Sequence, residues 1–124
     1  MILVDTSVWV DHLRAGDSAL RNLLESGRVL GHPWVTGELA LGNLAQRREV
    51  LGLLGGLPQA QVASTDEVAG FIETHRLYGL GIGYVDVQLL AATRLTRARL
   101  WSRDRRLAVA AQRLDVDAGL TPSG

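Results

Sequence analysis

Four acidic residues are the side chains of this sequence best suited to chemistry: Asp5, Glu38, Asp86 and Asp104. Carboxylates that lie close together repel one another unless a cation neutralises them. Oxygen ligands without any cysteine suit Mg²⁺ or Mn²⁺ rather than zinc. Such an ion lowers the pKa of bound water and polarises a phosphoryl oxygen, so these residues could support metal-assisted hydrolysis.

The composition leaves few other chemistries open. The 124 residues contain no cysteine, and all thirteen basic residues are arginine. The chain therefore has no disulfide framework, zinc–thiolate site or cysteine nucleophile, and no lysine for a P-loop, a Schiff base or a receiver-type phosphorylation site. A HAD-type phosphatase is excluded too, because it needs a second aspartate where Ser7 stands.

Length and composition predict a single domain over residues 1–124. The apolar fraction of 47% and the charged fraction of 21% are typical of a globular protein. The formal net charge of zero speaks against a general nucleic-acid coat protein. No segment resembles a signal peptide or reaches the roughly 18 apolar residues of a membrane span. We therefore expect a cytoplasmic protein that does not bind membranes.

Hydrophobic periodicity predicts short strands that alternate with helices. The predicted strands cover residues 2–4, 29–30, 61–63 and 99–102. The predicted helices cover residues 8–14, 18–25, 47–54, 84–98 and 104–114, and two more are capped by Thr36 and Thr65. Alternation of this kind implies parallel strands with right-handed crossovers. The expected fold class is α/β: a three-layer α/β/α sandwich with a short central parallel sheet.

These elements place the acids where a ligand site is expected. Asp5 and Asp104 each follow a predicted strand, and ligands of α/β sheets bind beyond the carboxyl ends of the strands. Asp86 lies in the first turn of the helix after a glycine-rich loop, and Glu38 in the first turn of the helix that starts near Thr36. Helix starts favour acids for capping alone, so each acid taken singly also has that simpler interpretation.

Four blocks of sequence together resemble the PIN-domain ribonucleases, and among these the VapC-type toxins of bacterial toxin–antitoxin pairs. The blocks are MILVDTSVWVDHLR, WVTGELALG, GIGYVDVQLLAA and LWSRDRRL, and they run from the first residue to about Leu107. Any one block is weak, but the set in this order and spacing is specific. The resemblance implies a PIN-like fold and endonucleolytic cleavage of RNA by metal-activated water.

The resemblance also implies a role for each of the four acids. They match the family's acidic quartet, which binds Mg²⁺ or Mn²⁺. Asp5 and Asp86 match the firmest metal ligands. Glu38 matches a residue that completes the site or positions water, and Asp104 matches the most variable member.

Hydroxyl residues beside the acids match the family as well. Thr6 and Ser7 match a hydroxyl pair after the first acid, and Ser102 matches a small hydroxyl residue that can orient a neighbour. Two positions depart from the common pattern, since Tyr84 stands where tryptophan is common and Ser102 where threonine is frequent. Neither departure removes a ligand.

The implied partners are an RNA substrate, a second copy of the chain in a homodimer, and a VapB-like antitoxin whose C-terminal segment fills the active-site groove. The alternative is a non-catalytic PIN-fold module that binds RNA or a partner protein without cutting. The intact quartet speaks against this alternative, because degenerate members usually lose one or more of the acids.

The arginines are concentrated in the C-terminal third, with seven of the thirteen between Arg94 and Arg113. Three of them, Arg103, Arg105 and Arg106, flank the last acid and could hold RNA phosphates. They could equally be solvated helix positions or contacts to the antitoxin.

We expect structural rather than catalytic roles for the histidines and the tryptophans. The histidines have no acidic partner at triad or metal spacing, and we expect surface or packing roles for His12, His32 and His75. The tryptophans sit inside apolar runs, and we expect core positions rather than base-stacking roles for Trp9, Trp34 and Trp101.

Overall fold

The computed structural model of the chain describes residues 1–120, so residues 121–124 of the predicted domain lie outside the described part. The elements of this part are β1 (Ile2–Val4), α1 (Thr6–Ala15), α2 (Ser18–Glu25), β2 (Val29–Leu30), α3 (Pro33–Ala40), α4 (Arg47–Gly56), α5 (Thr65–His75), α6 (Tyr84–Thr96), β3 (Arg99–Trp101) and α7 (Arg105–Arg113). None of these helices is long and apolar enough to cross a membrane.

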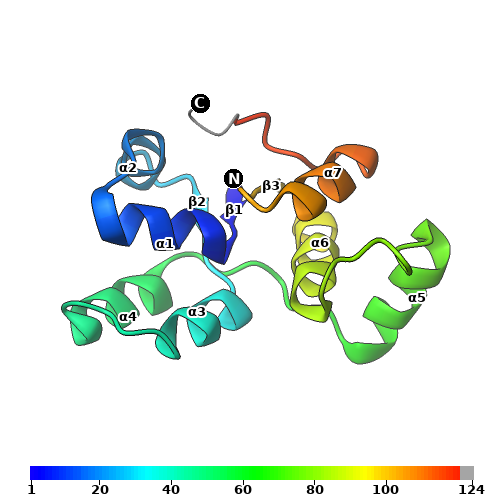
Figure 1. Cartoon of the computed structure of the whole chain (residues 1–124), viewed down its shortest axis with the longest axis horizontal. Helices are drawn as coiled ribbons and strands as arrows, with labels where there is room; N and C mark the ends of the chain where they lie inside the picture. Colours follow the sequence, from blue (N-terminus) through cyan, green and yellow to red (C-terminus); the bar gives the residue numbers. More distant parts are fainter. Residues whose placement is uncertain (121–124) are drawn as a thin grey trace.

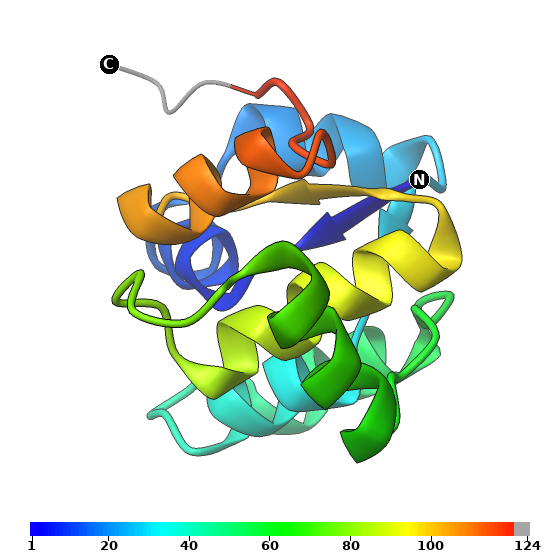
Figure 2. The same ribbon diagram turned by 90° about the vertical axis from the view of Figure 1, so that its right-hand side faces the viewer.

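The strands form one small parallel sheet in the order β2-β1-β3, with β1 in the middle (Figure 2). Leu3 of β1 pairs with Leu30 of β2 on one side and with Leu100 of β3 on the other. Because all three strands are parallel, their carboxyl ends meet at the same edge of the sheet. The residues that directly follow β1 and β3 are therefore neighbours.

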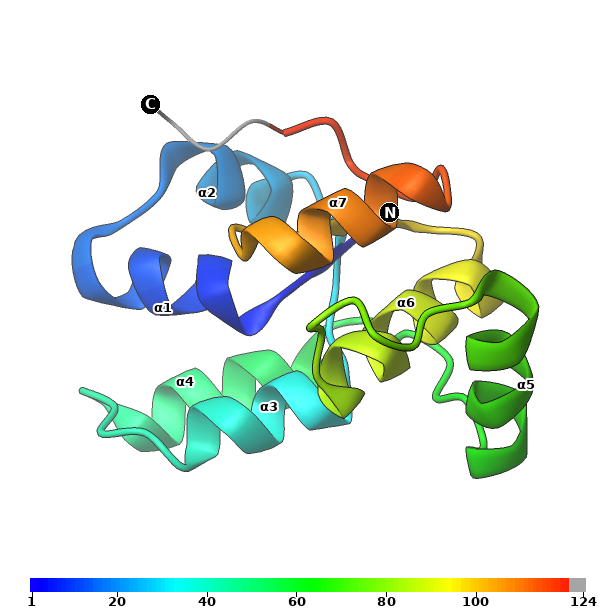
Figure 3. The ribbon, with the colours of Figure 1, turned by 45° about the vertical axis from the view of Figure 1, so that its right-hand side comes forward.

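Helices cover both faces of the sheet, which confirms the expected α/β/α sandwich. In Figures 1 and 2, α2 and α7 lie over one face, and α6 lies across the other, with α3 and α5 farther out. Figure 3 shows α3 and α4 side by side below α1. The chain passes from β1 to β2 over one face and from β2 to β3 over the other, so a topological switch point lies beside the end of β1.

The core fixes the two elements that carry the firmest predicted ligands. Every residue of β1 is buried, and so is the continuous stretch 87–93 of α6. A helix that is buried on nearly every side runs through the interior of a domain rather than along its surface. The ends of β1 and α6 are thus held rigidly, and Asp5 and Asp86 with them.

The prediction for the start of α3 is wrong. Thr36 does not cap this helix, because α3 begins at Pro33 and its N-cap is His32. The His32 ring is fully buried, and its Nδ1 accepts a hydrogen bond of 3.0 Å from the Trp34 amide. Burial lowers the pKa of His32, which favours the neutral ring that this acceptor role needs. Glu38 consequently lies in the second half of α3 and not in its first turn.

The predicted strand at residues 61–63 is also wrong. In the described chain, this region forms no strand, and the nearby Gln59 makes only an isolated bridge to Gly31. The Gln61 amide instead donates to the Thr96 hydroxyl at 2.9 Å. The helix that follows is capped by Ser64 rather than by Thr65, through a capping box with Glu67.

Candidate active site

Asp5 stands where β1 ends and α1 begins. It occupies the N-cap position of α1, but its side chain makes no capping hydrogen bond. Its Oδ2 instead accepts hydrogen bonds from the hydroxyls of Ser7 (2.7 Å) and Ser102 (2.8 Å). The residue is only 6% exposed. The interpretation of Asp5 as a mere helix cap is therefore wrong, because its oxygens are turned to other partners.

The two serines form a small network around Asp5. Their hydroxyl oxygens lie 3.4 Å apart. The Ser7 hydroxyl accepts from the Arg103 amide at 2.9 Å, and the Ser102 hydroxyl accepts from the Asp104 amide at 3.0 Å. Each hydroxyl thus donates to Asp5 while it accepts from the backbone of the loop after β3. The network fixes the orientation of Asp5 and ties the ends of two neighbouring strands together.

Glu38 approaches this edge of the sheet from α3. The Thr6 hydroxyl donates a 2.7 Å hydrogen bond to its Oε1. Thr6 is the residue directly after Asp5, so the first helix positions a carboxylate of the third. Of the hydroxyls predicted to support the site, the structure places Thr6 against Glu38, and Ser7 and Ser102 against Asp5.

Asp86 lies in the first turn of α6, as predicted, and its Oδ2 accepts from the Gly83 amide at 3.0 Å. Burial raises the pKa of this carboxyl, because the charged form loses solvation. The nearby carboxylates of Asp5, Asp104 and Glu38 raise the pKa further by repulsion, and the Gly83 hydrogen bond does not offset these effects. The three other predicted acids therefore lie close enough to Asp86 to act on its charge.

Asp104 is the N-cap of α7, and its Oδ1 accepts from the Leu107 amide at 3.1 Å. The simpler capping interpretation is correct for this residue as far as one oxygen is concerned. Its backbone amide is held by Ser102, so the residue has a fixed place at the carboxyl edge of the sheet.

The donor chemistry of the four acids fits a hard divalent cation. Within residues 1–120, hydrogen bonds reach one oxygen of each carboxylate: Oδ2 of Asp5, Oε1 of Glu38, Oδ2 of Asp86 and Oδ1 of Asp104. The second oxygen of each remains available to a ligand. In the same residues, no three Asp, Glu, His or Cys side chains are grouped closely enough to hold a metal ion as they stand. The ligand set thus stays a prediction.

Arg103 differs from the two other arginines near Asp104, because its guanidinium is paired. Nη1 binds Asp11 of α1 at 2.8 Å, and Nη2 binds Asp17, the N-cap of α2. Burial alone would raise the pKa of Asp17, but the Leu20 amide and Arg103 outweigh it and hold this pKa below its ordinary value. The guanidinium also lies 5.5 Å from the centre of the Trp101 ring. Arg103 therefore fastens the site loop to the first two helices.

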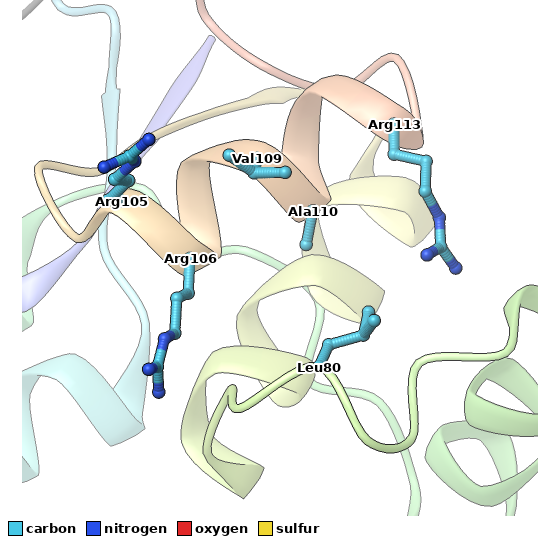
Figure 4. A pocket seen from close by; sticks show the side chains of 6 residues that line it. All are labelled: Leu80, Arg105, Arg106, Val109, Ala110 and Arg113. Carbon is cyan, nitrogen blue, oxygen red and sulfur yellow. The ribbon is translucent and has the colours of Figure 1, made fainter.

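Arg105 and Arg106 are exposed at the start of α7 and line a cavity of about 330 Å³ together with Arg113 (Figure 4). The two side chains leave the helix in different directions. Arg106 donates a long hydrogen bond of 3.4 Å to the carbonyl of Gly81. Gly81 has a φ of +74°, a backbone conformation that other side chains rarely adopt, so this turn favours glycine.

A second groove lies on the other side of the acids, between α1 and α3. Thr6 and Glu38 form part of its wall, and the rest combines apolar side chains such as Val10 and Leu13 with polar ones such as Arg14. Val10 and Leu13 are 47% and 36% exposed, which is high for side chains of this kind. Glu38 thus borders a groove whose wall is partly apolar and partly polar.

Sequence reasoning missed the partners of Arg103. Asp11 and Asp17 read as ordinary surface or capping residues, and Asp17 does cap α2. Nothing in the spacing shows that a guanidinium from residue 103 reaches both. The sequence feature that comes closest to indicating this pairing is Gly16, which directly precedes Asp17. It marks a break between two helices, where the side chain of an acid can point toward the protein interior.

The fold is a parallel three-stranded α/β sandwich with acids after β1 and β3, and similarity to known proteins gives the family. No family model matches the sequence. Ribonuclease VapC32 of Mycobacterium tuberculosis, in strain CDC 1551 / Oshkosh and again in strain ATCC 25618 / H37Rv, is 50% identical over 111 residues. The match covers 89% of this chain and 90% of each relative. The chain belongs to the VapC family of PIN-domain ribonucleases.

Proposed function

We propose that this chain is an RNA-cleaving hydrolase of a toxin–antitoxin pair: a single-domain endoribonuclease that depends on Mg²⁺ or Mn²⁺. The observation that carries the proposal is the environment of Asp86, whose pKa is raised by burial and by three neighbouring carboxylates. Carboxylates that repel one another are neutralised best by a bound cation, and Asp5 and Asp104 follow strands at the sheet edge where α/β folds bind ligands. The VapC relatives are named ribonucleases, which agrees with this chemistry.

The proposed ligands are Asp5 and Asp86, with Glu38 and Asp104 completing the set. Asp5 is the most buried of them, and two serine hydroxyls orient it. A bound Mg²⁺ or Mn²⁺ supplies an activated water and polarises a phosphoryl oxygen. We assign proton acceptance from water to the second oxygen of Glu38, since Thr6 holds the first one.

The reaction is hydrolysis of a phosphodiester. A water oxygen bonds to phosphorus, the bond from phosphorus to one ribose oxygen breaks, and the departing oxygen takes up a proton. The role of the basic surface is to hold the charged backbone of the RNA, because arginine forms paired hydrogen bonds with phosphate. Arg105 and Arg106 are the proposed phosphate contacts. Arg103 was a further candidate, but its guanidinium is already bound by two carboxylates.

The partners that we propose are RNA, a VapB-like antitoxin and a second copy of the chain in a homodimer, all in the cytoplasm. The groove between α1 and α3 supports the antitoxin assignment. An apolar segment laid along Val10 and Leu13 would end beside Glu38, and would thereby cover the acids.

The test is cleavage of total cellular RNA by purified protein that is free of antitoxin. We expect cutting with Mg²⁺ or Mn²⁺, none with EDTA, and a loss of at least about 100-fold in Asp5→Asn and Asp86→Asn. Asp66→Asn is the matched control, because Asp66 is an exposed acid in the first turn of α5. Undiminished cutting by Asp5→Asn would overturn the proposed site.

The alternative function is a non-catalytic module that binds RNA or a partner protein. It predicts intact RNA in every lane from protein that is folded and metal-loaded. The four carboxylates favour the enzyme over this alternative, because a module that only binds RNA has no use for acids that repel its ligand.

A further inference from the structure

One tryptophan is not where the apolar pattern places it. Trp9 and Trp101 are buried, with 1% and 2% of their surface exposed, as expected of core residues. Trp34 is 37% exposed, so the prediction of a core position is wrong for this residue. A large aromatic side chain that stays in contact with water needs an explanation, because its burial is strongly favourable.

Trp34 forms an aromatic pair with Tyr84. Their ring centres are 5.8 Å apart, and the ring planes meet at 53°. Tyr84 is itself 47% exposed. The two residues come from the first turns of α3 and α6, whose beginnings lie next to each other in Figure 3. Two helix starts therefore present a shared aromatic surface to the solvent.

This pair is held in place by its own protein. The buried His32 ring accepts the Trp34 amide, and Pro33 restricts the backbone at the first position of α3. Gln88, itself buried, donates to the Tyr84 hydroxyl at 3.3 Å. The hydrogen bond from the Gly83 amide to Asp86 fixes the first turn of α6 around Tyr84. A preformed surface of this kind loses little entropy when a ligand binds.

The pair also adjoins one of the four acids, Glu38. Glu38 follows Trp34 by four positions on α3, so the two side chains share a helix face with Cβ atoms about 6 Å apart. Asp86 follows Tyr84 by two positions in the first turn of α6, so its side chain leaves that helix on a different face. A nucleotide whose phosphate lies at the acids could therefore reach the aromatic rings with its base.

We propose that Trp34 and Tyr84 form a stacking platform for one unpaired base of the RNA substrate, next to the phosphate that is cut. The inference rests on the proposed ribonuclease function and adds a binding subsite to it. Proteins commonly recognise RNA by stacking unpaired bases on aromatic side chains. The platform selects an unstacked nucleotide, and it thereby directs cleavage to single-stranded loops rather than to continuous helices.

RNA fits this surface better than a protein segment does. The groove between α1 and α3 offers a separate place for an apolar segment, and its wall includes neither Trp34 nor Tyr84. The platform consists of two flat rings beside a carboxylate, which suits the face of a base next to a phosphate held by a cation.

The first experiment compares Trp34→Ala and Tyr84→Ala with the wild type on an RNA of about 12 nucleotides that the protein cuts. We expect KM to rise by roughly 5- to 150-fold and kcat to change by less than about threefold. Trp34→Phe is expected to restore most of the loss. Tyr78→Ala is the control, because Tyr78 is 61% exposed and lies outside α3 and α6.

A set of RNAs that each lack one base near the cut makes the test specific. In the wild type, one missing base is expected to raise KM as much as Trp34→Ala does. In Trp34→Ala, removal of the same base is expected to leave KM unchanged, because the ring on which that base would stack is already absent. An equal penalty in both proteins overturns the proposal, and so does an unchanged KM in Trp34→Ala, which a contact with a protein partner would give.

Fluorescence gives a readout that is independent of cutting. We expect a single-stranded oligouridine of about 12 nucleotides, with Ca²⁺ in place of Mg²⁺, to quench the tryptophan emission of Asp5→Asn. The quenching is expected to vanish when Trp34→Phe is added, because Trp9 and Trp101 are buried. Cutting without quenching overturns the platform and leaves the ribonuclease intact. Absence of both cutting and quenching overturns the two proposals together.

Discussion

The Ser102 hydroxyl donates a 2.8 Å hydrogen bond to Oδ2 of Asp5, although 97 positions of sequence separate the two residues. The same hydroxyl accepts a hydrogen bond from the Asp104 amide. One small side chain therefore connects the first acid of the chain to the last, across the carboxyl ends of β1 and β3. Outer hydrogen bonds of this kind orient metal ligands and keep them in the geometry that an ion needs.

Ser102→Ala is expected to lower cleavage by roughly 10- to 100-fold, because Asp5 loses one of the two hydroxyls that orient it. Ser102→Thr keeps the hydroxyl and is expected to restore activity. The measurement is kcat/KM on one RNA, with the apparent metal affinity determined in parallel. Ser26→Ala is the matched control, since its exposed hydroxyl bonds only to the Leu23 carbonyl far from the acids. Equal activity of Ser102→Ala and wild type would contradict the orienting role.

Arg103→Gln is expected to destabilise the fold by about 1–3 kcal/mol, because it leaves the mostly buried Asp17 carboxylate without its cation, while Asp11 keeps its pair with Arg14. The side chains of Arg103 and Asp17 are only 16% and 14% exposed. Arg14→Gln breaks an exposed pair with the same Asp11 and is expected to cost less than about 0.5 kcal/mol. Urea unfolding followed by circular dichroism measures both. A similar decrease in the free energy of unfolding in both variants would show that the ion pairs of Arg103 stabilise the fold no more than the exposed pair of Arg14 does.

Asp86→Asn is expected to stabilise the metal-free protein at neutral pH while it abolishes cleavage. The pKa of Asp86 is raised by folding, first through burial and then through the neighbouring carboxylates, so the ionised form is less favourable in the folded chain than in the unfolded one. This cost is present above the folded pKa and disappears below the unfolded value. The amide oxygen of asparagine can still accept the Gly83 amide.

The measurement for Asp86→Asn is Tm in EDTA at two pH values. We expect an increase of about 2–5 °C over the wild type near pH 7.5, and no difference near pH 3. An increase of the same size at both pH values would mean that packing, rather than charge, causes the effect.

Arg105→Gln and Arg106→Gln are expected to weaken RNA binding mainly at low salt. Each contact to a phosphate of single-stranded RNA contributes about 0.7 to the slope of log Kd against log salt, so each variant should reduce the slope by roughly that amount. Arg48→Gln on α4 is the control, because Arg48 is exposed and lies on a different surface. Binding of RNA to the inactive Asp5→Asn background measures the slope. Weaker binding with an unchanged slope would assign these arginines a role other than phosphate contact.

The sheet and the helices on it could be predicted from local patterns. The residues of β1 are apolar and directly precede an acid, and α6 combines a glycine-rich start with a long apolar run. Both predictions were correct because these patterns depend on residues that are neighbours in the sequence. The start of α3 was missed because histidine is an uncommon cap, and its role here depends on burial of the His32 ring by residues far along the chain.

The remaining differences come from contacts that no spacing reveals. Residues 61–63 have the composition of a strand, but a strand requires an edge to pair with, and the Thr96 hydroxyl takes the Gln61 amide instead. Trp34 lies in an apolar run like the other tryptophans. Its exposure to solvent depends on its packing against Tyr84, which comes fifty positions later in the sequence. The pairing of Arg103 is of the same long-range kind.

Three of the four acids stand at the beginnings of helices: Asp5 at α1, Asp86 at α6 and Asp104 at α7. The amino end of a helix carries a partial positive charge, equivalent to about half an elementary charge. Each of these three acids therefore lies beside a partial positive charge that is built into the backbone and cannot dissociate. Under the proposed function, a bound cation would complete the neutralisation of these carboxylates, which the helix ends supply only in part. A chelator is accordingly expected to silence the protein without unfolding it.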